Sequence, residues 1–137
     1  MERYGGSAVE VRDYDPSWPA LFDEECRRLR DVFGPAVTIE HIGSTSVPGL
    51  AAKPIIDLSV GVQNLAEAKS ICIEPLRAPR YTYLPEYESW LPDGLFFRKG
   101  IPGPWTHHVH VMEPSNPRWQ NHLLFRDYLR AHPETAT

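Results

Sequence analysis

Residues 36–62, AVTIEHIGSTSVPGLAAKPIIDLSVGV, consist of two apolar runs joined by a turn of small residues. The first run, residues 36–42, is β-branched and apolar, which predicts a strand. Gly43-Ser44-Thr45-Ser46 ends that strand because its small residues favour a tight turn. The second run, residues 55–62, is too short for most helices and rich in branched side chains. It predicts a central strand that carries one carboxylate, Asp57.

Helices are expected before and after this pair of strands. From residue 18 to residue 33, apolar residues follow the i, i+3, i+4, i+7 spacing of one buried stripe, and Gly34-Pro35 ends the helix. Asn64 is placed to cap a second helix through about Leu76, and Ser115-Asn116-Pro117 begins a closing helix. The stripe of the first helix comprises Leu21, Phe22, Cys26, Leu29, Val32 and Phe33.

Short strands separated by prolines complete the pattern. They are expected at residues 9–14, 81–83, 95–98 and 108–112. The order of strands and helices predicts an α/β sandwich of the α+β kind with a mixed sheet. A chain of 137 residues has little room for a second core, so we expect residues 1–137 to form a single domain.

Composition argues against several classes of protein. With 42% hydrophobic and 23% charged residues, the chain is typical of a globular protein. A formal net charge of −4 gives no overall positive field, which argues against duplex nucleic acid as a partner. The sequence shows neither an export signal nor a membrane-length apolar run, and Cys26 and Cys72 lack metal-type spacing. We therefore expect a cytoplasmic protein with buried free thiols and no membrane partner.

The turn at Gly43-Ser44-Thr45-Ser46 is a candidate phosphate-binding element. Its glycine and three hydroxyl residues can direct N–H and O–H groups toward an anion. The spacing is neither that of a Walker A loop nor that of a dinucleotide fingerprint. A plain polar turn is the alternative at this point.

Two pairs of polar residues alternate with apolar ones on the predicted strands. Asp57 and Ser59 share one face, and an unpaired carboxylate there needs a cation, hydrogen-bond donors or solvent. Its alternative role is to cap a helix or to pair with Lys53 or an arginine. His108 and His110 also share a face, which suits a metal, a phosphate or a proton, and their alternative is a solvated outer face.

Cations and tryptophans supply further candidates. Arg98 and Lys99 end a strand, and Arg126 and Arg130 lie one turn apart on the last helix, where they can hold negative charge. Asp127 could pair with these cations, which would make the group structural. The two tryptophans in proline-rich connections, Trp90 and Trp105, could cover a planar ligand, and packing explains them equally well.

Residues 40–57 resemble the signature of the GrpB family, which is placed within the nucleotidyltransferase superfamily. The similarity continues at residues 14–18, 106–111 and 125–133 and so covers nearly the whole chain. It implies a nucleotidyltransferase-like fold in which the glycine-serine turn faces a nucleotide phosphate and Asp57 occupies a metal-binding strand position. In some bacteria a similar domain is joined to dephospho-coenzyme A kinase, which points toward nucleotides.

One departure from the superfamily concerns the second metal-binding carboxylate. Its enzymes usually present Asp-x-Asp or Asp-x-Glu to hold two divalent metals, whereas the second position here is Ser59. Two-metal catalysis would need a replacement such as Glu40, Glu86 or the histidine pair. A one-metal site is more economical.

The leading hypothesis is a nucleotidyltransferase-like enzyme, a metal-dependent nucleotidyl- or phosphoryl-transferase. It would act on a nucleotide or another phosphorylated small molecule with Mg²⁺ or Mn²⁺, Zn²⁺ being the alternative metal. In this hypothesis the turn, with Ser44 and Ser46, holds phosphate. Asp57, His108 and His110 would hold the metal, and Lys53, Arg98 and Arg126 would neutralise charge. Lys99 and Arg130 would be further phosphate ligands. His41 would be a general acid or base, or else a packed histidine.

Two other hypotheses remain open. The chain could be a non-catalytic ligand-binding module that has lost the second acidic position, which Ser59 favours. It could also be a zinc hydrolase with Asp57, His108 and His110 as ligands. Because members of the family commonly carry another helix after residue 134, an uncovered apolar face is expected to favour a homodimer.

Overall fold

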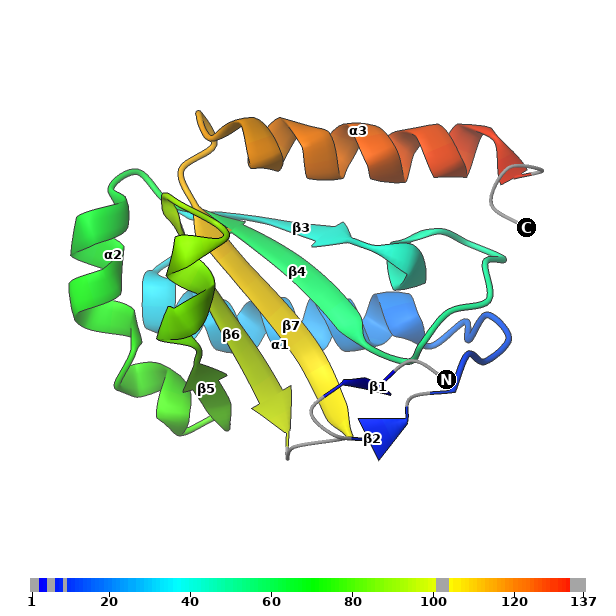
Figure 1. Cartoon of the computed structure of the whole chain (residues 1–137), viewed down its shortest axis with the longest axis horizontal. Helices are drawn as coiled ribbons and strands as arrows, with labels where there is room; N and C mark the ends of the chain where they lie inside the picture. Colours follow the sequence, from blue (N-terminus) through cyan, green and yellow to red (C-terminus); the bar gives the residue numbers. More distant parts are fainter. Residues whose placement is uncertain (1–2, 5–6, 9, 101–103, 134–137) are drawn as a thin grey trace.

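The centre of the molecule is a five-stranded sheet (Figure 1). The structure, a computed structural model, describes residues 3–4, 7–8, 10–100 and 104–133. The strand order is β3-β4-β7-β6-β5, in which β4 and β7 are parallel and every other neighbouring pair is antiparallel. The mixed sheet expected from the sequence is therefore confirmed. The strands are β3 (Thr38–Ile42), β4 (Ile56–Gly61), β5 (Tyr81–Tyr83), β6 (Gly94–Gly100) and β7 (Trp105–Met112), with β1 (Arg3–Tyr4) and β2 (Ser7–Ala8) forming a separate pair.

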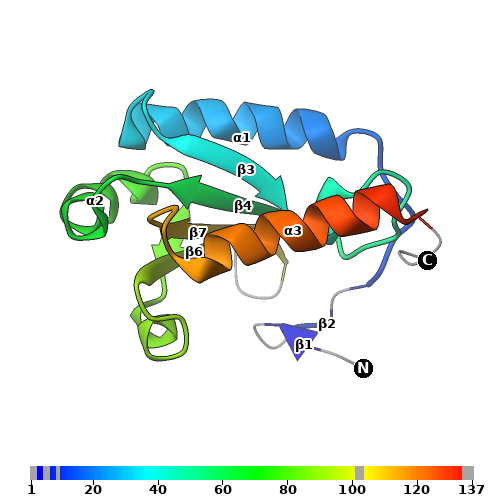
Figure 2. The same cartoon turned by 90° about the horizontal axis from the view of Figure 1, so that it is seen from above.

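Helices lie on both sides of this sheet, as the view from above shows (Figure 2). Helix α1 (Trp18–Phe33) covers one face together with α2 (Leu65–Cys72), and α3 (Pro117–Ala131) lies on the other side along β3. Three short 3₁₀ turns connect the elements, namely η1 (Ser44–Ser46), η2 (Pro75–Arg77) and η3 (Pro85–Ser89).

Side-chain caps begin two of the helices. The Asn64 side chain accepts a hydrogen bond from the N–H of Glu67, and the Asn116 side chain accepts one from the N–H of Arg118. Each cap satisfies one of the N–H groups that the first helical turn leaves without a partner. Both caps expected from the sequence are confirmed.

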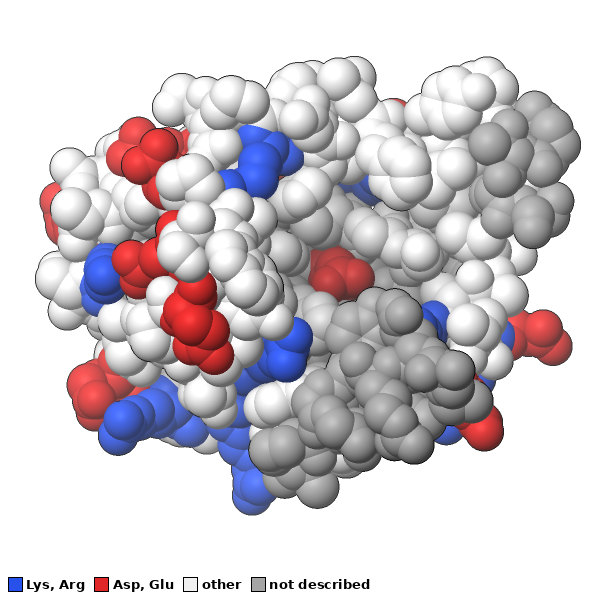
Figure 3. Space-filling model, in the orientation of Figure 1, with Lys and Arg blue, Asp and Glu red and all other residues white. Residues whose placement is uncertain are grey.

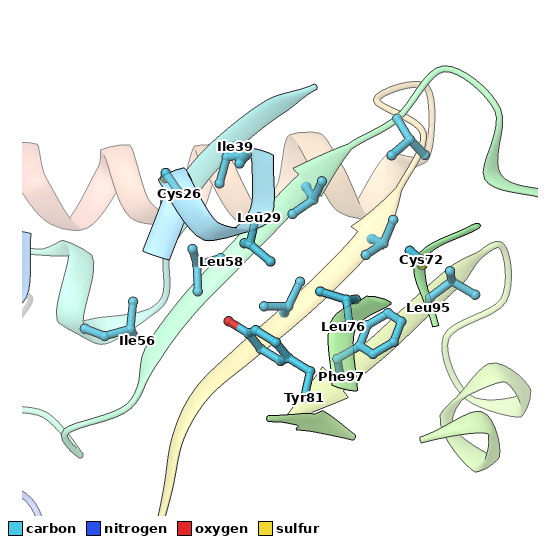
Figure 4. Packing of buried hydrophobic residues seen from close by; sticks show 14 of the residues in the cluster. Cys26, Leu29, Ile39, Ile56, Leu58, Cys72, Leu76, Tyr81, Leu95 and Phe97 are labelled. Atoms are coloured by element: carbon cyan, nitrogen blue, oxygen red, sulfur yellow. The ribbon is translucent and has the colours of Figure 1, made fainter. Parts of the chain in front are cut away.

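The hydrophobic core lies between the sheet and helices α1 and α2 (Figure 4). In β4, Leu58 and Val60 point into this core, whereas Asp57 and Ser59 alternate with them and point to the other face. Burying one such aliphatic side chain contributes roughly 1.5–3 kcal/mol, so this alternation fixes which face of β4 stays polar. The fully buried core side chains include Leu29, Leu58, Val60, Cys72, Leu76, Phe97, Val109 and Val111.

Both cysteines are buried and unpaired, as expected. No helix among the described residues is long and apolar enough to cross a membrane. The outer side of α3 exposes Leu124, Phe125 and Tyr128. Whether such apolar side chains promote a homodimer stays a prediction.

Two expected elements differ from the structure. The prediction of a strand at residues 9–14 is wrong over its described part, residues 10–14. There only Arg12 forms a β-bridge, to Ala52, because this segment runs beside a loop and not beside a strand. Val9 lies outside the described residues. The second helix ends at Cys72, and η2 covers Leu76, because a proline at residue 75 cannot continue the helix.

The buried stripe of α1 also differs from the expected one. Leu21 is 42% exposed, whereas Glu25 is completely buried. The inward side of α1 is centred on Trp18, Glu25 and Leu29, which places Leu21 at its edge. A carboxylate can occupy this central position because Tyr81 and Lys99 bind it from the sheet.

Candidate functional site

Polar side chains form two rows across the open face of the sheet, which we define as the face that carries Asp57 and Ser59. In the first row, Asp57 of β4 is paired with His108 of β7, and His108 is paired with Arg98 of β6. The second row runs from Glu40 through Ser59 and His110 to Phe96. Figure 3 shows this face with a hollow near its centre and an acidic side chain at the bottom of the hollow.

Asp57 and His108 are in direct contact. The Nδ1 atom of His108 lies 3.3 Å from Oδ1 of Asp57, and both side chains are partly shielded from solvent. Donation of the Nδ1 proton to the carboxylate would leave Nε2 of His108 as an acceptor. That Nε2 atom is buried and has no hydrogen-bond partner among the described residues.

The glycine-serine turn packs against the Asp57 carboxylate. Gly43 has a φ of +72°, and a Cβ atom at this position would collide with the carboxylate oxygen of Asp57. Only glycine combines this backbone conformation with such a close approach. The turn and the carboxylate therefore lie side by side.

The hydroxyl groups of the turn have different roles. Thr45 donates to the carbonyl oxygen of Ile55 at 3.1 Å, and Ser46 donates to the carbonyl oxygen of Gly43 at 2.5 Å. Both side chains are buried and stabilise the turn from within. Ser44 is exposed, so its hydroxyl is the one of the three that faces solvent.

A pocket of about 380 Å³ opens beside this turn. It brings together five residues that the sequence analysis singled out, namely Ser44, Thr45, Lys53, Asp57 and His108. We call it the Asp57 pocket. Its remaining lining comes from Val11, Ala51, Ala52 and Ile55.

His41 has the packed role that the sequence left open. It points to the α1 side of the sheet, stacks on Phe22 with ring centroids 4.8 Å apart, and contacts the Thr45 hydroxyl at 3.0 Å. Burial lowers its pKa to about 4. It is therefore neutral near pH 7 and supports the turn from behind.

Three of the predicted phosphate ligands make contacts within the protein. Lys99 projects to the α1 side and pairs with Glu25 at 2.9 Å. Arg126 donates to Glu40 at 2.7 Å, and Arg130 donates to the carbonyl oxygen of Ser46 at 2.9 Å. These two arginines tie α3 to β3 and to the turn, and their part in binding phosphate stays a prediction.

His110 shares the open face with His108 and has different neighbours. Its ring lies 4.8 Å from Phe96 and 5.3 Å from His122 of α3, and burial lowers its pKa to about 4. Over the described ranges, no three His, Cys, Asp or Glu side chains are grouped as a metal-binding set. The three-ligand set of Asp57, His108 and His110 thus stays a prediction.

The open face collects buried polar atoms that lack partners. Among the described residues, seven buried side-chain nitrogen or oxygen atoms have no hydrogen-bond partner. Six of them lie on the open face, and the seventh, the Tyr83 hydroxyl, lies on the α1 side. Such atoms cost free energy when they stay unsatisfied, so this cluster does not stabilise the fold. The six on the open face belong to Ser59, Arg98, Trp105, His108, Arg118 and His122.

Sequence reasoning missed two of these residues, Arg118 and His122. Both belong to one series with Arg126 and Arg130, in which basic or histidine residues recur every fourth position along α3. This spacing places them on one side of a helix. The four-residue spacing of Arg126 and Arg130, extended two turns toward the start of α3, identifies both residues from the sequence.

A family model described as GrpB protein matches residues 8–137. The chain belongs to the GrpB protein family. It is 48% identical over 134 residues to the UPF0157 protein YqkA of Bacillus subtilis, covering 97% of this chain and 38% of that protein. Four such relatives are matched over 38% to 65% of their own length, so the chain spans only part of each.

One solved GrpB structure and two differently named proteins are also similar to this chain. The crystal structure of GrpB from Enterococcus faecalis superposes with a TM-score of 0.81 at 40% identity, covering 93% of this chain and 76% of that one. A dephospho-CoA kinase of Mycolicibacterium paratuberculosis is 33% identical over 88% of this chain and 35% of its own. The Cid1 poly(U) polymerase, with MgGTP bound, gives a TM-score of 0.57 at 19% identity over 88% of this chain and 39% of its own. This likeness shows a shared nucleotidyltransferase-like fold.

Proposed function

We propose that this GrpB protein binds the phosphate groups of a nucleotide or another phosphorylated small molecule, together with a divalent cation, in the Asp57 pocket. The observation that carries the proposal is the close packing of the Gly43 turn against the Asp57 carboxylate. It puts a phosphate-type turn, a carboxylate and Lys53 at one pocket. The Cid1 poly(U) polymerase, which shares the fold, has MgGTP bound.

The donor set at this pocket fits Mg²⁺ or Mn²⁺ better than Zn²⁺. Asp57 offers carboxylate oxygens on a side chain that is 27% exposed, and hard cations such as Mg²⁺ are commonly held by one or two carboxylates, waters and substrate phosphates. Catalytic zinc sites usually have three closely spaced protein ligands, and no three His, Cys, Asp or Glu side chains of the described residues form such a group. Asp57 would hold the cation, which would neutralise charge on the phosphates, and His108 would orient the carboxylate.

The nearest residues leave the second metal position without a free carboxylate. Ser59 occupies it, and the neighbouring Glu40 is held by Arg126. Binding of this kind would serve either nucleotidyl or phosphoryl transfer or a non-catalytic binding module. The missing second carboxylate is the observation that favours the binding module as the second candidate function. Detection of a transferred group or of released pyrophosphate would decide for the enzyme.

Calorimetric titration of metal-stripped protein with nucleoside triphosphates, with and without Mg²⁺ or Mn²⁺, tests the proposal. We expect binding that depends on the cation and falls at least tenfold in Asp57→Asn. The control is Asp31→Asn, an exposed carboxylate on α1, which should bind as the wild type does. Binding that is unchanged in Asp57→Asn would overturn the proposed site, and the absence of binding to any phosphorylated probe would overturn the function.

A further inference from the structure

We propose that Trp90, supported by Tyr87 and Arg98, forms a stacking platform for the base of a nucleotide whose phosphates occupy the Asp57 pocket. The inference rests on the proposed function and narrows its ligand to one that carries an aromatic ring. We call these three residues the Trp90 platform.

Arg98 is held rigidly on the open face by aromatic rings. Its guanidinium carbon lies 5.5 Å from the Tyr87 ring centre and 5.6 Å from that of Phe96, within the range of cation–π contacts. Its Nη2 atom donates to the Tyr87 hydroxyl at 2.8 Å, whereas its Nε atom is buried without a partner among the described residues. One donor of this arginine is thus fixed by the protein, which holds the guanidinium beside the aromatic rings.

A β-bulge brings a third ring to the same guanidinium. Lys99 pairs with His107, and the next residue, Gly100, pairs with Trp105, so Thr106 is the extra residue on β7. Such a bulge changes the direction of nearby side chains. The Trp105 ring lies 5.5 Å from the guanidinium carbon of Arg98, and its Nε1 is also buried without a partner within the described ranges.

Trp90 is the most exposed of the large apolar side chains described, at 74%. It is nevertheless held in place. The backbone N–H of Trp90 donates to the carbonyl oxygen of Tyr87 at 3.1 Å, and the Trp90 ring packs edge-on against the Tyr87 ring with centroids 5.5 Å apart. Tyr87 in turn packs on Phe96, 4.8 Å away. An exposed indole on a fixed support offers a π surface on which a base can stack.

The position of the platform matches the order of groups in a nucleotide. Arg98, His108 and Asp57 lie on three adjacent strands, so the backbones at Arg98 and Asp57 are about 10 Å apart, two strand spacings. Arg98 therefore lies between the Asp57 pocket and the aromatic side chains. If the phosphates of a nucleotide bound between Asp57 and Arg98, its base would extend beyond Arg98 toward Trp90.

The test compares ATP with inorganic tripolyphosphate, both with Mg²⁺, by calorimetric titration. Tripolyphosphate carries the anionic chain without a base, so only ATP should depend on the platform. In Trp90→Ala we expect ATP to bind about tenfold or more weakly, as loss of one stacking contact implies, and tripolyphosphate to bind as in the wild type. Trp90→Phe, which keeps a ring, should restore most of the difference.

The matched control is Phe125→Ala, which removes another exposed aromatic side chain, 63% exposed on the outer side of α3, and should leave both ligands unaffected. Equal weakening of ATP and tripolyphosphate in Trp90→Ala would overturn the platform, and so would ATP binding that does not change. Either result would leave Asp57-dependent tripolyphosphate binding, and with it the proposed function, intact. If the wild type binds neither probe, the platform fails, whereas the proposed function fails only if no other phosphorylated probe binds.

Discussion

Glu25→Gln tests the ionic network that holds α1 on the sheet. Glu25 is completely buried, and its carboxylate accepts hydrogen bonds from the Tyr81 hydroxyl at 2.6 Å, from Lys99 at 2.9 Å and from Arg28 at 2.9 Å. Burial alone would raise the pKa of Glu25, but the hydrogen bonds from Tyr81 and Lys99 outweigh it and lower that pKa below its ordinary value of 4.5. The substitution keeps the shape of the side chain and removes its charge.

The expected loss follows from what the variant leaves behind. Lys99 is only 17% exposed and would keep its charge without a carboxylate partner. Breaking a buried pair in this way costs about 3–5 kcal/mol, and we expect a value near the lower end because the introduced glutamine amide would still accept one hydrogen bond. The control is Glu24→Gln, which removes an exposed partner of Arg28 and should cost less than about 1 kcal/mol.

Urea unfolding monitored by tryptophan fluorescence measures these free energies. Because the folded pKa of Glu25 is lowered, its contribution is complete above about pH 4.5 and is lost as the pH falls through the folded pKa. The gap between wild type and Glu25→Gln should therefore narrow in acid. In a cycle with Lys99→Met, the double variant should lose less than the sum of the single losses. A loss in Glu25→Gln no larger than that in Glu24→Gln, or strictly additive losses, would refute the reasoning.

Two further predictions concern the turn and the histidine behind it. Gly43→Ala should weaken nucleotide binding and lower the free energy of unfolding more than Gly49→Ala does. Both positions have positive φ, but only a Cβ at residue 43 meets Asp57. Titration and urea unfolding of the two variants measure the difference, and equal effects would contradict the close approach. His41→Gln should flatten the loss of stability in acid, since the folded pKa of about 4 lies below the ordinary 6.5 and the wild type loses up to about 3 kcal/mol as the pH falls from 6.5 to 4. Unfolding free energies across that pH range check this, and identical slopes would contradict it.

Local patterns in the sequence sufficed for most of the fold. The alternation in residues 55–62, the Asn64 cap and the glycine after Phe33 each reflect chemistry within a few residues, and the structure has the corresponding strand, helix start and helix end. The same reasoning placed Asp57 and His108 on polar faces of their strands. It could not show that β4 and β7 are neighbours, which is what brings these two side chains together.

Long-range partners explain what sequence reasoning missed. Glu25 lies in a helix pattern that favours a solvated acid, and only Tyr81 and Lys99, more than fifty residues away, make its burial possible. Arg126 and Arg130 are likewise predicted phosphate ligands, and only the placement of α3 against β3 and the turn shows the contacts that they make within the protein. In each case the identity of the residue was informative, and its partner depended on topology.

The two faces of the sheet differ in whether their buried polar groups have hydrogen-bond partners. On the α1 side, Glu25 and His41 have partners within the protein, and the Tyr83 hydroxyl is the exception among the described residues. On the open face, six buried polar atoms have none within the described part of the chain. A buried polar atom without a partner costs about 1–3 kcal/mol, so these six atoms do not stabilise the fold, and one of them, Nε2 of His108, belongs to the side chain that contacts Asp57. These atoms are shielded from solvent, so a ligand would reach them only if the side chains that cover them moved. Ser44 and Asp57 are accessible polar groups at the pocket, which is why binding should be sought there first.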